Sequence, residues 1–522
     1  MNTIREALAI AFAHHSRGEL AQAENIYRQI LEQQPLHADV LHRLGVLVLQ
    51  TGHAADAVTL LERSVAENPY NAPALTNLGL AYSVTRRYDE ARVILEEAVR
   101  LDPANAGAYG NLGMVLHNLG RPNDAVSSYR KSLQLEPDSV VTNSNLGVAL
   151  QDLSRLDESQ QCYERARELA PNQAVSHFNM ATVLKDQGHL AAAIDCFEQA
   201  LRLKPDDAQA LCGLGTVWLS MGDFAAGWAA YEHRVGCPQF NTFQFPQPLW
   251  DGSPLADRTL LIHCEQGLGD TLQFIRYVKL AEERGNKIIV AAQPALIPLL
   301  AQSGFTGLVP RNGPLPAFDV HAPLMSLPNI FRTTEQTVPR DVPYLAADEE
   351  RTARWREKLS QFHGLKVGIA WQGRMPFTSD RMRSIALEQF APLARIPNVR
   401  LLSLQKGPGS EQIAALAGSF EVIDLAEDLD PAGGAFLDTA AVMKSLDLVV
   451  MSDTGPAHLA GALGVPIWMA LGRTSEWRWM LNRADSPWYP TMRLFRQPES
   501  GGWQPVFEAM ARKLKQGPEG AA

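Results

Sequence analysis

The spacing of the prolines constrains this chain more than any other feature. Prolines stand at positions 35, 69, 103, 137, 171 and 205, and each successive pair is 34 residues apart. A period of this length indicates a repeat architecture in which each unit packs on its neighbours. Because proline cannot continue a helix, each of these residues marks the end of a helix in its unit.

Small and large residues keep the same period between the prolines. Small side chains at two positions allow a pair of antiparallel helices to approach closely, and a large side chain fills the space between them. The first small position holds Gly45, Gly79, Gly113, Gly147, Ala181 and Gly215, the second holds Ala23, Ala57, Ala91, Ala125, Ser159, Ala193 and Gly227, and the large position holds Tyr27, Leu61, Leu95, Tyr129, Tyr163, Phe197 and Tyr231.

These units resemble tetratricopeptide repeats, and the resemblance covers seven repeats over residues 1–240. It implies an all-α superhelix that binds a protein or peptide in its groove. Four asparagines inside the repeats, similar to the asparagine ladder of O-GlcNAc transferase, are candidates to bind the backbone of an extended peptide, because an amide offers both a donor and an acceptor. The alternative is that they only meet water. They are Asn77, Asn111, Asn145 and Asn179.

The periodicity changes in the second half of the chain. Residues 241–258, rich in proline and aromatics, are predicted to form an ordered linker. Apolar runs such as "KIIVAA" and "LDLVVMSD" then predict strands that alternate with helices, as in a parallel α/β layer. We expect two Rossmann-like lobes, over residues 259–345 and 364–515, with a closing helix at the end of the second lobe and a ligand cleft at the carboxyl ends of the strands.

The turn "GLGDTL" follows the first strand of the second half. Leu272 stands where a dinucleotide fingerprint needs its third glycine, so a nicotinamide enzyme is disfavoured, and no phosphate-binding G-x-x-x-x-G-K loop is present. Gly269 leaves the backbone open near a helix start. Asp270 is either a helix cap or a catalytic carboxylate.

A second turn follows the strand "LDLVVMSD". Asp453 ends that strand, and Thr454 and Gly455 begin a helix whose free amides can face a diphosphate. His458, one turn later, either reaches a phosphate or sugar or is a structural histidine. This turn predicts a seat for an activated sugar.

Together, "LLIHCEQGLGDTLQFIRY" and "SDTGPAHLAGALGVPIWMALG" resemble the heptosyltransferase family (glycosyltransferase family 9-like), which has the two-lobed GT-B fold. The resemblance implies that Asp270 acts as base and that Asp453, Thr454, Gly455 and His458 hold a nucleotide sugar. The lysine-bearing loop of that family reads "GRMPFTSDRMRSIALEQF" here, with arginines instead, so the donor need not be ADP-heptose.

Displacing a nucleoside diphosphate from an anomeric carbon requires a base for the acceptor and compensation for developing phosphate charge. Asp270 is the candidate for the first role. Arg381, Arg383 and Lys406 are candidates for the second, with a solvated loop as the alternative for the arginines. No cofactor and no metal are expected.

These features predict a glycosyltransferase, inverting by resemblance, whose repeats present a protein or glycan acceptor to the GT-B module. A second enzymatic interpretation is modification of a surface or lipid-linked glycan, with the repeats docking an assembly partner. The rival is a non-catalytic scaffold with a degenerate nucleotide-binding lobe.

Composition limits the partners and the compartment. A net charge of -10 without runs of like charge disfavours nucleic acid as a partner. The five cysteines form no C-x-x-C pair, and we identify neither a leader nor an apolar run long enough to span a membrane. We therefore expect a cytoplasmic protein.

Overall fold

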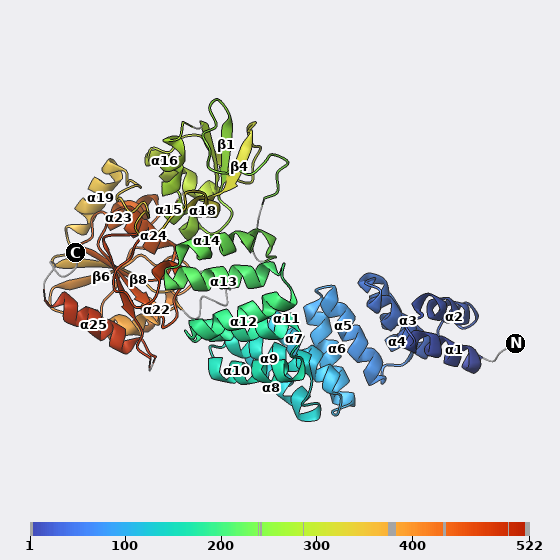
Figure 1. Ribbon diagram of the computed structural model, residues 1–522. Coiled ribbons are helices and arrows are strands. Elements are labelled where there is room, and N and C mark those ends of the chain that lie inside the picture. Colours follow the sequence, from blue (N-terminus) through green and yellow to red (C-terminus); the bar gives the residue numbers. More distant parts are fainter. Residues whose placement is uncertain are drawn as a thin grey trace. The chain divides into compact units, whose positions relative to one another are not determined.

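The computed structural model describes residues 4–238, 240, 243–285, 287–373, 383–431, 435–499 and 501–516. The chain divides into two compact units, residues 1–183 and 184–522. Figure 1 labels the elements of both. One helix, α11 (Ala174–Asp186), contains the boundary.

The first unit is an array of antiparallel helix pairs. Consecutive helices pack on each other, and the first helices of adjacent repeats also meet, as in α5 and α7. Each buried core therefore extends from one repeat to the next, as expected of a repeat array. The helices are α1 (Ile4–Ser16), α2 (Leu20–Gln33), α3 (Ala38–Gln50), α4 (Ala54–Glu67), α5 (Ala72–Val84), α6 (Tyr88–Leu101), α7 (Ala106–Asn118), α8 (Pro122–Leu135), α9 (Val140–Asp152) and α10 (Leu156–Leu169).

The 34-residue period also determines where the helices begin and where the turn between the two helices of each repeat lies. The first helices of several repeats are capped by a side chain two residues after the repeat proline, as in Asn71 Oδ1, which accepts the Ala74 N–H at 3.2 Å. The turn inside each repeat contains a residue with a left-handed backbone, which glycine adopts most easily. That turn position holds Gly18, Gly52, Arg86, Gly120, Ser154, Gly188 and Gly222.

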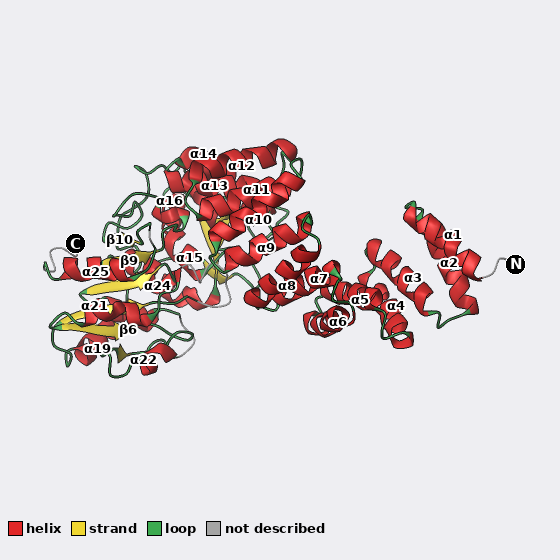
Figure 2. Cartoon of the chain, turned by 90° about the horizontal axis from the view of Figure 1, so that it is seen from below, coloured by secondary structure: helices red, strands yellow, loops and turns green. Residues whose placement is uncertain are grey.

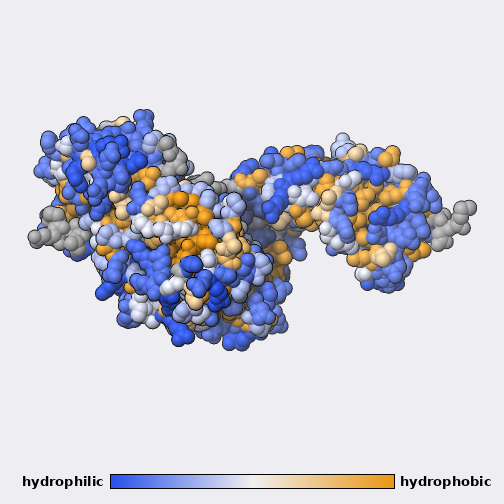
Figure 3. All heavy atoms as spheres, turned by 90° about the horizontal axis from the view of Figure 1, so that it is seen from above, coloured by the Kyte–Doolittle hydropathy of each residue, from blue (hydrophilic) through white to orange (hydrophobic). Residues whose placement is uncertain are grey.

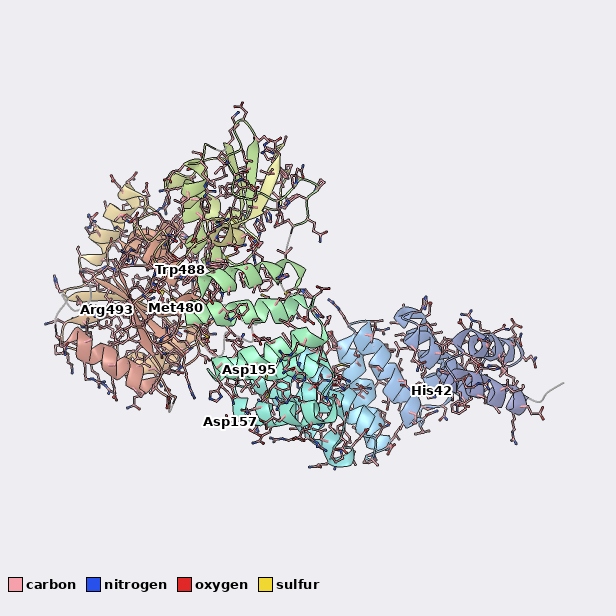
Figure 4. All side chains as sticks on the ribbon, in the orientation of Figure 1. His42, Asp157, Asp195, Met480, Trp488 and Arg493 are labelled. Atoms are coloured by element: carbon pink, nitrogen blue, oxygen red, sulfur yellow. The ribbon has the colours of Figure 1, made fainter. Side chains whose placement is uncertain are left out.

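The second unit begins with the last helices of the repeat array. Trp228 is buried there, its indole N–H donates to the Thr333 carbonyl at 3.1 Å, and its ring lies 6.4 Å from that of Trp488. Figure 4 labels Trp488 in the α/β region. Arg234, fully buried, pairs with buried Glu265 at 2.9 Å. The last repeat is thereby joined to the α/β region. Its elements are α12 (Leu190–Leu203), α13 (Ala208–Met221), α14 (Phe224–Tyr231) and η1 (Glu232–Gly236).

The first α/β layer holds a four-stranded parallel sheet of order β3-β2-β1-β4. The connector before it is ordered where described, because Leu249 forms a parallel bridge with His321 at the sheet edge. Its elements are β1 (Thr259–His263), α15 (Leu268–Phe274), α16 (Arg276–Glu282), β2 (Lys287–Ala292), η2 (Pro294–Leu296), α17 (Ile297–Gln302), β3 (Leu308–Pro310), β4 (Val320–Pro323), η3 (Leu324–Ser326) and α18 (Leu327–Ile330).

The second α/β layer holds a six-stranded parallel sheet of order β10-β9-β8-β5-β6-β7, with helices around the strands (Figure 2). Along β8, Val449 and Met451 enter one core and Leu448 and Val450 enter the other, so both faces are buried. Its elements are α19 (Glu349–Leu359), β5 (Leu365–Ala370), η4 (Leu387–Phe390), α21 (Ala391–Ala394), β6 (Val399–Ser403), α22 (Glu411–Ala415), β7 (Ile423–Asp424), α23 (Leu437–Met443), β8 (Leu448–Ser452), α24 (Gly455–Ala462), β9 (Ile467–Leu471), η5 (Trp477–Trp479), β10 (Met492–Arg496) and α25 (Gln504–Leu514).

The final helix packs on this second layer. The ring of Phe507 on α25 lies 4.4 Å from that of Phe390, and both belong to the core that also contains Trp468 of β9. The amphipathic pattern of α25 is thus explained by burial against its own sheet.

Hydrophilic and hydrophobic side chains are interspersed over the face seen in Figure 3. Large hydrophobic side chains that are exposed on the repeats lie in several elements: Tyr70 is in the turn between α4 and α5, and Val141 is on α9. Among the described helices, none has both the length and the apolar character needed to cross a bilayer.

Candidate functional site

Asp270 stands at the point where the order of the first sheet reverses. β1 lies between β2 and β4, and ligands of parallel α/β sheets bind at the carboxyl end of such a strand. Asp270 Oδ2 accepts the Gly267 N–H at 2.9 Å and so caps α15. Its Oδ1 accepts a hydrogen bond from Nη2 of Arg478. The carboxylate is therefore a helix cap and one half of an ion pair.

Asp453 has the equivalent place in the second sheet. It follows β8, which pairs with β5 on the side opposite β6, so the sheet order reverses here as well. Asp453 is buried, and its Oδ2 accepts the Trp479 indole N–H at 2.7 Å. Thr454 is the N-cap residue of α24, and its hydroxyl donates to the Ser452 carbonyl.

The two turns meet at Gly269. A Cβ atom at Gly269 would lie 3.0 Å from His458 Cδ2 and 3.3 Å from Gly455 Cα. Only a glycine fits this close approach of α15 to α24 without displacing one of them. The structure thus brings together the two motifs that the sequence separates by more than 180 residues.

Asp270, Asp453 and Arg383 line one cavity of about 370 Å³ inside the second unit. Its wall combines the end of α11, α13, Tyr231, both turns and the segment after β9. The lining residues are Lys185, Asp186, Gly188, Leu190, Thr216, Ser220, Tyr231, Phe240, Gln266, Asp270, Arg383, Asp453, Ala470, Leu471, Gly472, Thr474, Ser475, Glu476, Trp477, Arg478 and Leu481.

Burial dominates the electrostatics of the two carboxylates. Burial raises the pKa of Asp453 to about 6, Glu476 adds to the rise, and the hydrogen bond from Trp479 opposes it. Burial also raises the pKa of Asp270, while the Arg478 guanidinium opposes the rise. Asp270 is thus a better proton acceptor than an exposed aspartate, and Arg478 limits this effect.

Arg478 contacts Asp270 and Trp479 contacts Asp453, and neither residue was predicted from the sequence. They belong to η5, in the run "EWRWM" after β9. Charged and aromatic residues within ten positions of the carboxyl end of a buried strand were the available signal.

The repeats contribute one wall of this cavity, which the sequence did not predict. The Thr474 hydroxyl donates to the Asp186 carbonyl at 2.8 Å, and the Leu481 N–H donates to the Ser220 carbonyl at 3.2 Å. These bonds join the segment after β9 to the ends of α11 and α13. Asp186 and Ser220 occupy the same helical position in successive repeats, and the bonds use their backbone carbonyls, so the side-chain pattern does not signal these contacts.

Of the other predicted donor-binding residues, Gly269, Thr454 and Gly455 are not among the lining residues of the cavity, and His458 and Lys406 have partners away from it. His458 does not line the cavity: its Nδ1 is 3.0 Å from the Tyr489 hydroxyl, and its ring stacks on Trp479. Burial keeps the pKa of His458 well below its ordinary value, so the ring is neutral. Lys406 Nζ donates to the Leu429 and Asp430 carbonyls, away from the cavity. Arg381 lies outside the described residues.

The four asparagines of the proposed ladder lie in the first unit and are half-buried. The Asn77 amide is 2.8 Å from His42 Nε2, a residue of the preceding repeat (Figure 4). Within the described part of the chain, the side-chain amides of Asn111 and Asn145 make no hydrogen bond to protein, so they remain available to a ligand or to water.

Among the described residues, no three histidine, cysteine, aspartate or glutamate side chains are grouped so that they would hold a metal ion.

The comparisons with known proteins concern mainly the repeats. A family model described as the C-terminal domain of cilia and flagella-associated protein 70 matches residues 3–216. The match and the 34-residue helical period together identify the array as tetratricopeptide repeats. Protein FlbA of Caulobacter vibrioides is 30% identical over 319 residues, which is 55% of this chain and 52% of FlbA. The chain thus spans about half the length of this curated relative.

Solved repeat structures are also similar to parts of the chain. A crystal structure of MamA is 25% identical, covers 31% of this chain and 94% of its own, and has a TM-score of 0.29. YrrB, described as a TPR protein with an unusual peptide-binding site, is 21% identical over 35% of this chain and 95% of its own, with a TM-score of 0.31. PilF of Pseudomonas aeruginosa is 23% identical over 40% of this chain and 94% of its own, with a TM-score of 0.36.

Proposed function

We propose that the protein is a metal-independent glycosyltransferase of the GT-B type, which moves a sugar from a nucleotide-sugar donor to a protein or glycan acceptor recruited by the repeats. One observation carries the proposal. Asp270 and Asp453, each at the point where the order of its own parallel sheet reverses, line a single cavity together with Arg383. Such reversal points are the usual ligand sites of parallel α/β sheets.

In the proposed reaction Asp270 is the base. It accepts the proton of the acceptor hydroxyl as that oxygen bonds to the anomeric carbon, and the bond from this carbon to the phosphate oxygen breaks with inversion. The electron pair leaves with the nucleoside phosphate. Arg383 and the backbone amides at the start of α24 stabilise the developing charge.

In this proposal, an acceptor bound to the last repeats reaches Asp270 directly. Thr216, Ser220 and Tyr231 come from the last repeats and line the same cavity as Asp270. An acceptor held by the repeats therefore needs no separate docking surface to reach the base. The half-buried asparagines of the first unit are proposed to bind the backbone of a peptide acceptor further along the array.

The alternative is a scaffold in which the α/β region is structural. One observation favours it: both carboxylates are already bonded within the protein, Asp270 to Arg478 and Asp453 to Trp479. A purely structural role requires no more than these contacts. The two functions differ in whether a nucleotide sugar binds.

The deciding experiment is a thermal-shift screen of ADP-, UDP-, GDP-, CMP- and dTDP-sugars. We expect one donor class to stabilise the wild type, by mass action, and to stabilise Asp453→Asn less. Asp438→Asn is the matched control, because Asp438 also accepts an indole N–H, from Trp355 at 3.0 Å, and pairs with Arg351, but does not line the cavity. If no donor stabilises a folded wild type, the scaffold is the better description.

A further inference from the structure

Arg478 is a buried cation inside the cavity wall, and two carboxylates share it. Its side chain is only 7% exposed. Nη2 contacts Asp270 and Nη1 contacts Glu476, while Nε donates to Gln273 Oε1 at 2.8 Å. The guanidinium also lies over the ring of Trp477, 4.5 Å from its centre. Packing and hydrogen bonds therefore fix the position of this charge.

The carboxylate partners of Arg478 differ in how firmly they are held. Asp270 is tied to the Gly267 amide and its side chain is 21% exposed, whereas the Glu476 side chain is 50% exposed. If Glu476 separates from Arg478, water can solvate its carboxylate. If Asp270 separates from Arg478, it still accepts the hydrogen bond from the Gly267 amide. If another anion replaces either carboxylate at Arg478, the guanidinium and both carboxylates therefore all keep a hydrogen-bond partner.

The cavity has too little positive charge to take up an anion without such an exchange. Among the described residues, four carboxylates and three basic side chains line it. An added phosphate raises the negative charge further, and its own charge is compensated locally only if it pairs with a basic side chain. Phosphate and carboxylate oxygens compete for the same paired N–H groups of an arginine, and phosphate carries the larger charge.

We propose that Arg478 is the counter-ion of Asp270 only in the ligand-free protein, and that a donor phosphate takes it over. Donor binding then has two results. The guanidinium is placed beside the leaving group, and Asp270 loses its cationic partner and becomes a stronger base. This inference rests on the proposed transferase function and deepens it, because it makes the anionic donor the switch that activates the base.

The atoms balance without any further reactant. The acceptor hydroxyl gives its proton to Asp270, the acceptor oxygen bonds to the anomeric carbon, and the phosphate oxygen leaves with the electron pair beside Arg478. Without donor, Asp270 remains paired with Arg478 and cannot deprotonate an acceptor efficiently.

The test is isothermal titration of the full chain with inorganic pyrophosphate at low ionic strength. We expect Arg478→Gln to weaken binding about tenfold or more, since a charged hydrogen-bond partner is lost. Asp270→Asn and Glu476→Gln should each bind pyrophosphate several-fold more tightly, because each removes a competing carboxylate. A merely structural role of the Arg478 pairs would not produce this gain.

Matched controls come from the ion pair of Arg351 and Asp438, whose guanidinium and carboxylate are 2.8 Å apart outside the cavity. Arg351→Gln and Asp438→Asn should leave pyrophosphate affinity unchanged. If Arg478→Gln does not fold, the two carboxylate variants decide, because the side chains that they change are partly exposed.

Unchanged or weaker binding to both Asp270→Asn and Glu476→Gln would overturn the exchange, and so would the absence of any pyrophosphate binding to the wild type. In either case a nucleotide sugar that stabilises the wild type more than Asp453→Asn would leave the proposed function in place. Failure of both experiments would reject the function itself.

Discussion

The same repeat position has different roles in the two units. Tyr129 and Tyr231 are three repeats apart and occupy the same place in the 34-residue pattern. Tyr129 is a core residue of its repeat, and its ring lies 2.7 Å from where a Cβ of Gly113 would be. Tyr231 lines the cavity, and its hydroxyl accepts a hydrogen bond from Gln266 at 3.2 Å.

The difference arises from what covers the helices. Within the first unit each helix packs on helices of its own and adjacent repeats. In the second unit α14 is followed by the α/β layers, and Trp228 contacts aromatic rings from three other segments, Phe274, Trp477 and Trp488. A repeat pattern therefore specifies the helix pair, and the next segment of the chain decides whether its faces become core, surface or site.

The largest expected effect comes from removing the residue that distinguishes the last repeat. Trp228→Ala should destabilise the second unit by about 3–5 kcal/mol, because it leaves a large cavity and a Thr333 carbonyl without its donor. All ten tryptophans lie between positions 218 and 503, so urea unfolding followed by tryptophan fluorescence reports on the second unit.

Val126 is the matched control for Trp228, since it is buried at the same repeat position three repeats earlier. Val126→Ala should shift the helical circular-dichroism transition of the first unit and leave the fluorescence transition in place. A Trp228→Ala protein with an unaltered fluorescence midpoint would contradict the central position of this side chain.

A medium effect is expected from adding one methyl group at equivalent glycines. At Gly215 the new Cβ would lie 2.7 Å from the Tyr231 backbone nitrogen, whereas at Gly113 it would meet only the Tyr129 ring. A ring moves more easily than a backbone, and the natural chain already has Ala181 at this position. Gly215→Ala should cost about 2–3 kcal/mol and Gly113→Ala about 1 kcal/mol, measured by fluorescence and circular dichroism respectively. Equal costs would show that the last repeat packs no more tightly than the others.

The smallest effect concerns one hydroxyl group. Within the described residues the buried Tyr27 hydroxyl has no hydrogen-bond partner, whereas the Tyr231 hydroxyl has Gln266. Tyr27→Phe should be neutral or slightly stabilising, and Tyr231→Phe should cost about 0.5–1.5 kcal/mol. Circular dichroism measures the stability of Tyr27→Phe and tryptophan fluorescence that of Tyr231→Phe. A loss of stability in Tyr27→Phe would show that the Tyr27 hydroxyl has a hydrogen-bond partner.

The sequence predicted the elements with strong periodicity. The repeats follow from the 34-residue step, and "KIIVAA" and "LDLVVMSD" contain β2 and β8 because continuous apolar runs are typical of buried parallel strands. β3 and β4 were not identified. They are three and four residues long and end at prolines, so no alternating or apolar run is long enough to mark them.

The candidate site was predictable only in part. Asp270 and Asp453 stand beside glycines after strands, a local signal that the sequence carries. The contact of Arg478 with Asp270 joins residues 208 positions apart, and the contact of Trp479 with Asp453 depends on the backbone turn of η5. Lys406 resembled a phosphate ligand in sequence, but its ammonium group has two backbone carbonyls as partners.

The boundary within α11 has an evolutionary consequence. Repeats before it pack mainly on adjacent repeats, whereas those after it form a wall of the cavity. A duplication or deletion of 34 codons in the earlier part changes the length of the array and the partners it selects, and leaves every residue around Asp270 and Asp453 in place. If the proposed function holds, partner choice and chemistry are therefore under separate genetic control, and a lineage can acquire new partners without changing Asp270 and Asp453.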